Sequence, residues 1–199
     1  MEGQKLPHGD VTREKLLHSA LSLFHQFGYN GTSVQDIVAE AGVPKGSFYN
    51  HFKSKEEIAI AASDLYSSIL LSHLELENTL SPVKRLRNFF RYIVREMQRY
   101  EYTRGCLLGN FAAEITNATP TLMNRMSEHL DDATRRIVIV IAQAQQAGEM
   151  DATLPPLEFS RFLLDSLYGA IFRSKADRTE RPMKSFERFA FAPFIIKVR

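Results

Sequence analysis

The stretch AGVPKGSFYNHFKSKEEI, residues 41–58, decides how the N-terminal part of the chain folds. Gly42 is suited to end a helix, because glycine adopts a left-handed backbone without steric cost. Pro44 is suited to the first position of a second helix, where its missing N–H would be unpaired in any case. Ser54 and Glu57 have the spacing of a capping box that opens a third helix. The stretch therefore predicts a tight turn between two helices, with another helix directly after them.

The residues before this stretch predict two helices. Thr12 is available as the N-cap of a helix over residues 12–27, and Gly28 is available to end it. Apolar side chains follow one face of that helix, at Leu17, Ala20, Leu21 and Phe24. Ser33 and Asp36 then resemble a capping box, which opens a helix that reaches Ala41.

The helix predicted over residues 44–52 has two unlike faces. Phe48 and Phe52 form one apolar stripe that can pack onto the helix before it. The other positions carry polar side chains or glycine, with Gly46 and Asn50 outermost and Lys45, Ser47, Tyr49 and His51 beside them. Two short helices joined by a tight turn are typical of the helix-turn-helix, whose second helix enters the major groove of DNA. A helix pair inside a protein core has the same spacing, so both interpretations stay open on this pattern alone.

The rest of the chain predicts further helices and no strand. We expect one helix from Ser54 to Glu77, and others that start near Pro82, Pro120, Pro156 and Pro182. The β-branched run IVIVI lies inside an unbroken segment over residues 120–147, which favours a buried helix. The chain is therefore predicted to be all-α. A three-helix domain over residues 1–53 would precede a larger helical domain over residues 54–199.

Composition narrows the class of protein. Hydrophobic residues make up 44% and charged residues 24% of the 199 residues, as in ordinary globular proteins. The longest apolar run, residues 137–142, is far shorter than the roughly 20 residues that span a bilayer. The N-terminus lacks the pattern of a signal peptide, and the single cysteine excludes an intrachain disulfide. We therefore expect a cytoplasmic protein without a membrane segment.

The chain offers little for catalysis. Cys106 with a histidine base would suit a cysteine-dependent enzyme, but the six histidines show no catalytic signature and no zinc-binding spacing. Phosphate-binding glycine loops are also missing from the sequence. We expect no enzyme, no metal and no cofactor. A helical adaptor that binds only protein remains an alternative to a DNA-binding protein.

The run GYNGTSVQDIVAEAGVPKGSFYNHFKSKEEI, residues 28–58, resembles the DNA-binding region of the TetR family of bacterial transcriptional repressors. The sequence departs from the family pattern at Val38, where alanine is frequent, and at Pro44, where serine or threonine is frequent. The resemblance implies a helical homodimer whose two recognition helices read a palindromic operator in double-stranded DNA. It also implies that the larger domain forms the dimer and binds a small-molecule inducer.

The resemblance assigns roles to the polar residues of this region. Base or backbone readers are expected at Lys45, Gly46 and Ser47, with Asn50 on the outermost face. Phosphate contacts are expected at Thr32, Ser33, Tyr49, His51 and Lys55.

The segment RGCLLGNFAAEI, residues 104–115, resembles a stretch in the subgroup that includes the NemR and AcuR repressors, some of which respond to electrophiles or reactive metabolites. Cys106 is therefore a hypothetical sensor, with Arg104 and Lys175 as nearby cations that would favour its thiolate. The alternative is that Cys106 is a small buried hydrophobe, as free cysteines usually are.

The later helices hold candidates for the inducer cavity and the dimer interface. Aromatic side chains that line a cavity or fill the core are expected to include Phe89, Phe111, Phe162 and Tyr168. The dimer interface is expected to use small residues and exposed aromatic rings, at Ser166, Gly169, Ala170, Phe186 and Phe189. The basic residues of the segment 173–199 are expected to form a solvated face, with a second DNA site as the alternative. Pro193 is expected to end the last helix and to leave Phe194 against an unidentified contact.

Overall fold

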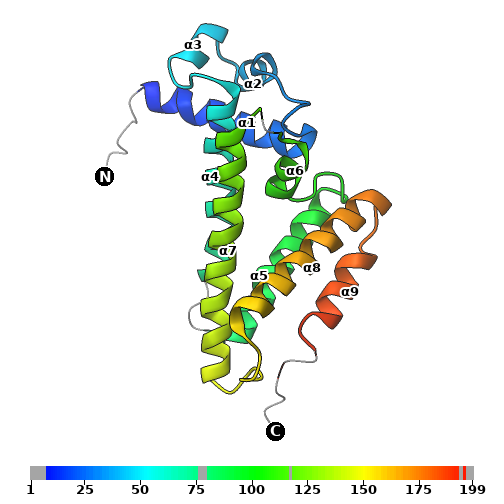
Figure 1. The fold of residues 1–199 in the computed structure, drawn as a ribbon. Helices are drawn as coiled ribbons and strands as arrows, with labels where there is room; N and C mark the ends of the chain where they lie inside the picture. The colour runs from blue at the N-terminus through cyan, green and yellow to red at the C-terminus, as the bar shows by residue number, and fades with distance from the viewer. Residues whose placement is uncertain (1–7, 76–79, 117, 193–194, 196–199) are drawn as a thin grey trace, which may run out of the picture. The chain divides into compact units, whose positions relative to one another are not determined.

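The computed structural model describes residues 8–75, 80–116, 118–192 and 195. These residues form nine helices and no strand, which confirms the all-α prediction (Figure 1). In chain order the helices are α1 His8–Phe27, α2 Val34–Ala41, α3 Lys45–Tyr49, α4 Lys55–Glu75, α5 Pro82–Arg99, α6 Leu107–Glu114, α7 Pro120–Gln146, α8 Pro156–Asp177 and α9 Arg181–Phe189. None of the helices in these ranges combines the length and apolar character that a membrane span requires.

The predicted ends of α2 are confirmed. The Ser33 hydroxyl oxygen accepts the backbone N–H of Asp36 at 3.2 Å, and the Asp36 carboxylate accepts the backbone N–H of Ser33 at 2.8 Å. Gly42 ends the helix with a left-handed φ of +65°. Both ends follow from side-chain and backbone chemistry within a few residues, which is why the sequence was sufficient to predict them.

Three predicted helix ends in the N-terminal region were wrong. Helix α1 begins at His8 and not after Thr12, because no proline interrupts residues 8–11 and the first turn extends past the expected cap. Helix α3 ends at Tyr49 and not at Phe52, and Pro44 is its N-cap and not its first helical residue. The backbone N–H groups of residues 51 and 52 both donate to the carbonyl oxygen of Phe48 at 2.9 Å, which closes the helix in a tight turn.

The later helices agree with the proline signals. The run IVIVI, residues 137–141, lies within α7 as predicted. Its side chains Ile137, Val140 and Ile141 are buried. The predicted end of α4 at Glu77 and the contact expected for Phe194 lie outside the described residues. The prediction that the last helix extends to Pro193 was wrong, because α9 ends at Phe189 and a turn follows it. Ile195 forms an isolated antiparallel bridge with Met150.

The chain divides into two compact units. The first consists of residues 1–66 and 107–126, and the second of residues 67–106 and 127–199. Helices α4 and α7 therefore each contribute to both units, and α6 belongs to the first. The predicted division at residue 53 stays a prediction.

Helix α1 contacts α2, α3 and α6 and so forms the centre of the first unit. Phe24 of α1 contacts Phe111 of α6, with 5.4 Å between the ring centres, and Tyr29 lies 5.8 Å from the same ring. Phe48 is fully buried in the same unit. Aromatic packing of this kind holds the short helices in place, since helices of five or eight residues are marginal in isolation.

The second unit has its own aromatic core. Helix α9 runs back along α8 and also contacts α5 (Figure 1). Phe90 of α5 lies 5.2 Å from the ring of Phe186 in α9 and 5.3 Å from that of Phe191. The polar side chain of Ser160 in α8 is also buried here, where its hydroxyl donates to the carbonyl oxygen of Thr134 in α7 at 3.1 Å.

Candidate nucleic-acid interface

Helix α3 is anchored by two phenylalanines. The rings of Phe48 and Phe52 lie 5.9 Å apart, and both side chains are buried as predicted. The guanidinium of Arg13 in α1 lies 5.1 Å from the centre of the Phe52 ring, a cation–π contact. The buried stripe sets the rotation of α3, so the opposite face must point into solvent.

The outward face of α3 carries the side chains that were predicted to read DNA. Lys45, Gly46, Tyr49 and Asn50 are exposed, and Ser47 and His51 are half-buried. A Cβ atom at Gly46 would meet no atom within 4 Å, so no neighbour in the chain requires glycine there. The missing side chain instead leaves room for a close approach by an external partner.

Tyr49 is held in a defined direction. Its ring packs edge-on against Phe48 with 5.2 Å between centres, while 56% of the residue stays exposed. A side chain that is fixed at its base and open at its hydroxyl suits a hydrogen bond to a phosphate or a base edge.

The two residues before α2 are engaged within the chain. Thr32 is buried, and its hydroxyl donates to the carbonyl oxygen of Gly28 at 2.9 Å. The Ser33 hydroxyl lies 2.6 Å from the Asp36 carboxylate, and hydrogen bonds from Ser33 hold the pKa of Asp36 below its ordinary value. Their phosphate contacts stay predictions, and the backbone around them is held by these hydrogen bonds.

Lys55 faces the turn between α1 and α2. Its ammonium donates to the carbonyl oxygens of Tyr29 at 3.0 Å and of Thr32 at 3.2 Å. It also lies 4.2 Å from the centre of the Tyr29 ring. Burial lowers the pKa of Lys55, and the nearby Glu114 opposes that shift. The side chain predicted to contact phosphate thus tethers the turn in this structure.

Sequence reasoning missed one part of this region. The Glu114 carboxylate accepts the backbone N–H of Asn30 at 2.9 Å, and the Asn30 side-chain amide donates to the Glu114 carbonyl oxygen at 3.3 Å. No local pattern signals this pair, because 84 positions separate the two residues in sequence.

The candidate sensor residues lie in the second unit. Cys106 is buried directly before the first residue of α6, and Lys175 is half-buried on α8. The guanidinium of Arg104 lies 4.0 Å from the centre of the Tyr100 ring. Burial, followed by the charges of Cys106 and Asp165, raises the pKa of Tyr168, which keeps its phenol neutral.

The aromatic side chains predicted to line one cavity lie in different environments. Phe89 is buried against Phe90, whereas Phe111 belongs to the core of the first unit. Phe162 is 51% exposed on α8, although its ring stacks on Phe159. These differences follow from tertiary packing, which a count of aromatic residues does not reveal.

The candidate dimer residues also differ in how far they are exposed. Gly169 and Phe189 are exposed, and Ser166 and Ala170 are half-buried. Phe186 is buried against Phe90, so it stabilises the fold of its own unit and offers little area to a partner.

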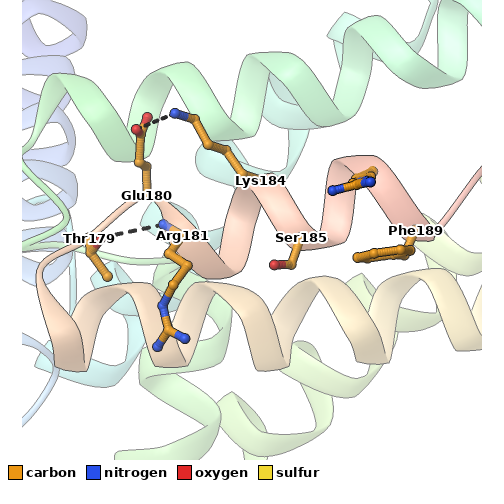
Figure 2. Close-up of a pocket in the computed structure, with 7 residues that line it drawn as sticks. Thr179, Glu180, Arg181, Lys184, Ser185 and Phe189 are labelled. Carbon is orange, nitrogen blue, oxygen red and sulfur yellow. Dashed lines mark hydrogen bonds and ion pairs between the residues drawn. The ribbon is translucent and has the colours of Figure 1, made fainter.

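An open hollow of about 290 Å³ lies along α9 (Figure 2). Its lining is mostly polar and charged, and consists of Thr179, Glu180, Arg181, Lys184, Ser185, Arg188 and Phe189. Lys184 pairs with Glu180, and the Arg181 backbone N–H donates to the Thr179 hydroxyl at 3.4 Å. Across the residues that the structure describes, no three histidine, cysteine or acidic side chains gather in a way that would hold a metal ion.

Two family models match the chain. The model of bacterial regulatory proteins of the tetR family matches residues 16–62, and the model of the tetracyclin repressor-like C-terminal domain matches residues 82–190. The two matches cover the α2–α3 region and most of the second unit, respectively.

Individual relatives agree with these models. The chain is 34% identical to the HTH-type transcriptional repressor DhaR of Mycobacterium sp. strain GP1, over 90% of both chains. It is 30% identical to the transcriptional regulator AcuR of Cereibacter sphaeroides, over 97% of this chain and 90% of AcuR.

The solved structure of a regulatory protein TetR from Rhodobacter sphaeroides superposes with a TM-score of 0.85 at 30% identity, over 92% of this chain and 99% of that one. The predicted resemblance is therefore confirmed. The chain belongs to the TetR family of bacterial regulatory proteins and is a DNA-binding transcriptional regulator.

Proposed function

We propose that this regulator is a homodimeric repressor that binds a palindromic operator through the outward face of α3. The observation that carries the proposal is the two-sided character of this helix. Phe48 is buried on one face, while Lys45, Tyr49 and Asn50 are exposed with Gly46 on the other. A buried anchor below a row of hydrogen-bond donors is what a recognition helix requires. DhaR is named a repressor, which supports the direction of regulation.

A second copy of the chain is the proposed partner of α8 and α9. Phe162, Gly169 and Phe172 follow one another at spacings of seven and three residues, so they share one face of α8. Phe172 is 75% exposed and Phe189 of α9 is 63% exposed, which is unusual for large apolar side chains. Gly169 has open space at its Cβ position, so another helix can approach closely there. Two copies of this α8–α9 face would bury one another's aromatic rings.

We further propose that a small apolar or electrophilic inducer acts through the region of Cys106. The thiol is buried beside the start of α6, and the nearby phenol of Tyr168 is a neutral hydrogen-bond donor. Lys175 lies one helical repeat of seven residues after Tyr168 on α8, so both side chains leave the same side of that helix. Release from DNA would follow if the inducer favours a conformation whose two recognition helices no longer match successive major grooves.

A gel-shift titration with the DNA upstream of the protein's own gene tests the DNA-binding proposal. The wild type should retard this DNA, and the affinity should fall steeply as salt rises. Lys45→Ala should weaken binding. It should also lower the salt slope, the steepness with which log affinity falls against log salt concentration, by about one unit. Lys84→Ala, at an exposed lysine of α5, removes the same charge from the second unit and should bind like the wild type. A wild type that retards no DNA would favour the helical adaptor that binds only protein.

A further inference from the structure

The turn between α1 and α2 is held by side chains from two other helices. Lys55 of α4 donates to the carbonyl oxygens of Tyr29 and Thr32, at 3.0 and 3.2 Å. Glu114, the last residue of α6, accepts the Asn30 backbone N–H at 2.9 Å. The peptide group between Tyr29 and Asn30 is therefore bonded by long-range partners at both its carbonyl and its N–H, and the carbonyl of Thr32 shares the same lysine. All of these groups belong to the first unit.

Glu114 is in close contact with the turn. A Cβ atom added to Gly28 would lie 2.0 Å from Oε1 of Glu114, so the carboxylate occupies the space that any other residue at position 28 would fill. Gly28 has a φ of +78°, which glycine adopts freely. The Asn30 side chain also donates to the carbonyl oxygen of Glu114, which is one of the last carbonyls of α6.

The remainder of α6 holds Glu114 in position. Phe111, one turn earlier on the same helix, is fully buried against Phe24 and Tyr29. The apolar anchor and the carboxylate therefore contact the end of α1 and the turn together. Because the Ser33 cap follows this turn directly, the turn determines the position in space of the N-terminal end of α2.

We propose that Glu114 is a positioning residue for DNA binding: its carboxylate holds the turn of residues 28–32, and thereby the N-terminal end of α2, in the geometry that meets the operator. The carboxylate itself touches no DNA in this proposal. Its negative charge would repel phosphate, so its contribution to binding comes from its reach and its hydrogen bond. This inference rests on the proposed DNA-binding surface of α2 and α3.

Three substitutions separate reach from charge. Glu114→Asp keeps the charge but withdraws the carboxylate by about 1.5 Å, one carbon–carbon bond. Glu114→Gln keeps an acceptor oxygen at the same reach but removes the charge. Glu114→Ala removes both. The Kd of each variant for the DNA upstream of the protein's own gene is measured by fluorescence anisotropy at one fixed salt concentration, because affinity for DNA depends strongly on salt.

The positioning role and electrostatics alone predict opposite orders of DNA affinity among the three Glu114 variants. Glu114→Asp and Glu114→Ala should each weaken binding about tenfold, whereas Glu114→Gln should stay within about threefold of the wild type. If charge alone mattered, Glu114→Gln and Glu114→Ala would bind more tightly and Glu114→Asp would equal the wild type. That second order would overturn the proposal. Glu14→Ala, at an exposed acid of α1 in the same unit, is the matched control for loss of one negative charge.

Hydrogen exchange at the Asn30 amide is the second measurement. A residue that only stabilises the fold would change this exchange without changing the affinity for DNA, whereas a positioning residue changes both. In Glu114→Asp the amide should exchange faster, with an otherwise native thermal transition. Faster exchange without a loss of DNA affinity would refute the positioning role, even if Glu114→Ala does not fold. Failure of the wild type to bind DNA would instead refute the proposed function, so the two failures are distinguishable.

Discussion

The ammonium nitrogen of Lys55 lies 3.0 Å from the carbonyl oxygen of Tyr29 and 4.2 Å from the centre of the Tyr29 ring. A cation in this position satisfies a backbone carbonyl and an aromatic face at once, and it thereby ties the start of α4 to the turn before α2. Lys55 is thus a structural tether in the free protein, in the position where the family resemblance implies a phosphate contact.

Replacing Lys55 by methionine separates the tether from a phosphate contact. The loss of two charged hydrogen bonds should lower the free energy of unfolding by about 1–3 kcal/mol, measured by urea denaturation. If Lys55 acts only as the tether, the salt slope of DNA binding should match that of the wild type, while Lys45→Ala lowers it by about one unit. Native stability with a lower slope would show instead that Lys55 releases the turn and contacts phosphate.

Replacing Gly28 by alanine should be more costly than replacing Gly42 by alanine. Both glycines end a helix with positive φ, so alanine costs about 1–2 kcal/mol at either position. At Gly28 the new methyl group must also displace the Glu114 carboxylate, whereas the Cβ position of Gly42 is open. Thermal unfolding of both variants measures the difference, which we expect to be about 1 kcal/mol or more. Equal destabilisation would show that Glu114 moves aside at no cost.

Substituting Phe172 by aspartate should dissociate the proposed homodimer. A charge in the centre of an aromatic interface should raise the dimer dissociation constant more than tenfold, which analytical ultracentrifugation detects. Ile139→Asp is the matched control, because Ile139 is 57% exposed on α7 and lies outside the α8–α9 face. Dimers that persist in Phe172→Asp would exclude this face as the interface.

Cys106 provides a direct test of electrophile sensing. An electrophile such as N-ethylmaleimide should release the wild type from DNA and leave Cys106→Ser bound. Because Cys106 is the single cysteine of the chain, the variant removes every thiol from the protein. Equal release of both proteins would refute sensing through this residue and favour its role as a small buried hydrophobe.

The capping box of α2 should make stability depend on pH in the acid range. Hydrogen bonds from Ser33 lower the pKa of Asp36 below its ordinary value of 3.8. A depressed pKa means that the carboxylate stabilises the fold above pH 3.8 and that this contribution is lost as the pH falls through the folded-state pKa. The unfolding temperature of the wild type should therefore exceed that of Asp36→Asn at neutral pH and approach it in acid. A gap that stays constant from neutral pH to well below pH 3.8 would contradict this account.

Local signals in the sequence predicted the elements of the DNA-binding region and its buried stripe. Ser33 with Asp36, and Gly42, determine the ends of α2 through contacts over three or four positions. The spacing of Phe48 and Phe52 was sufficient to identify the buried side of α3, and therefore which polar side chains lie outside. The length of α3 was overestimated, because the backbone N–H groups of residues 51 and 52 both donate to the carbonyl oxygen of Phe48 and close the helix in a tight turn.

Roles were predicted less accurately for residues whose contacts lie far away in the sequence. Phe111 and Phe186 both have the apolar character expected of a cavity or an interface, yet each is buried in the core of its own unit. Composition cannot distinguish these positions, because the same aromatic ring suits all three environments.

The sequence by itself determined that the chain is helical, that α2 and α3 form a helix-turn-helix, and that the protein belongs to a family of DNA-binding regulators. These properties depend on propensities, caps and motifs, each of which lies within a short stretch of the chain. Only the tertiary structure decided that Lys55 faces Tyr29 and that Glu114 contacts Asn30 across 84 positions. Hydrogen bonds between distant segments depend on how helices pack, and packing is a property of the whole chain that no local pattern encodes.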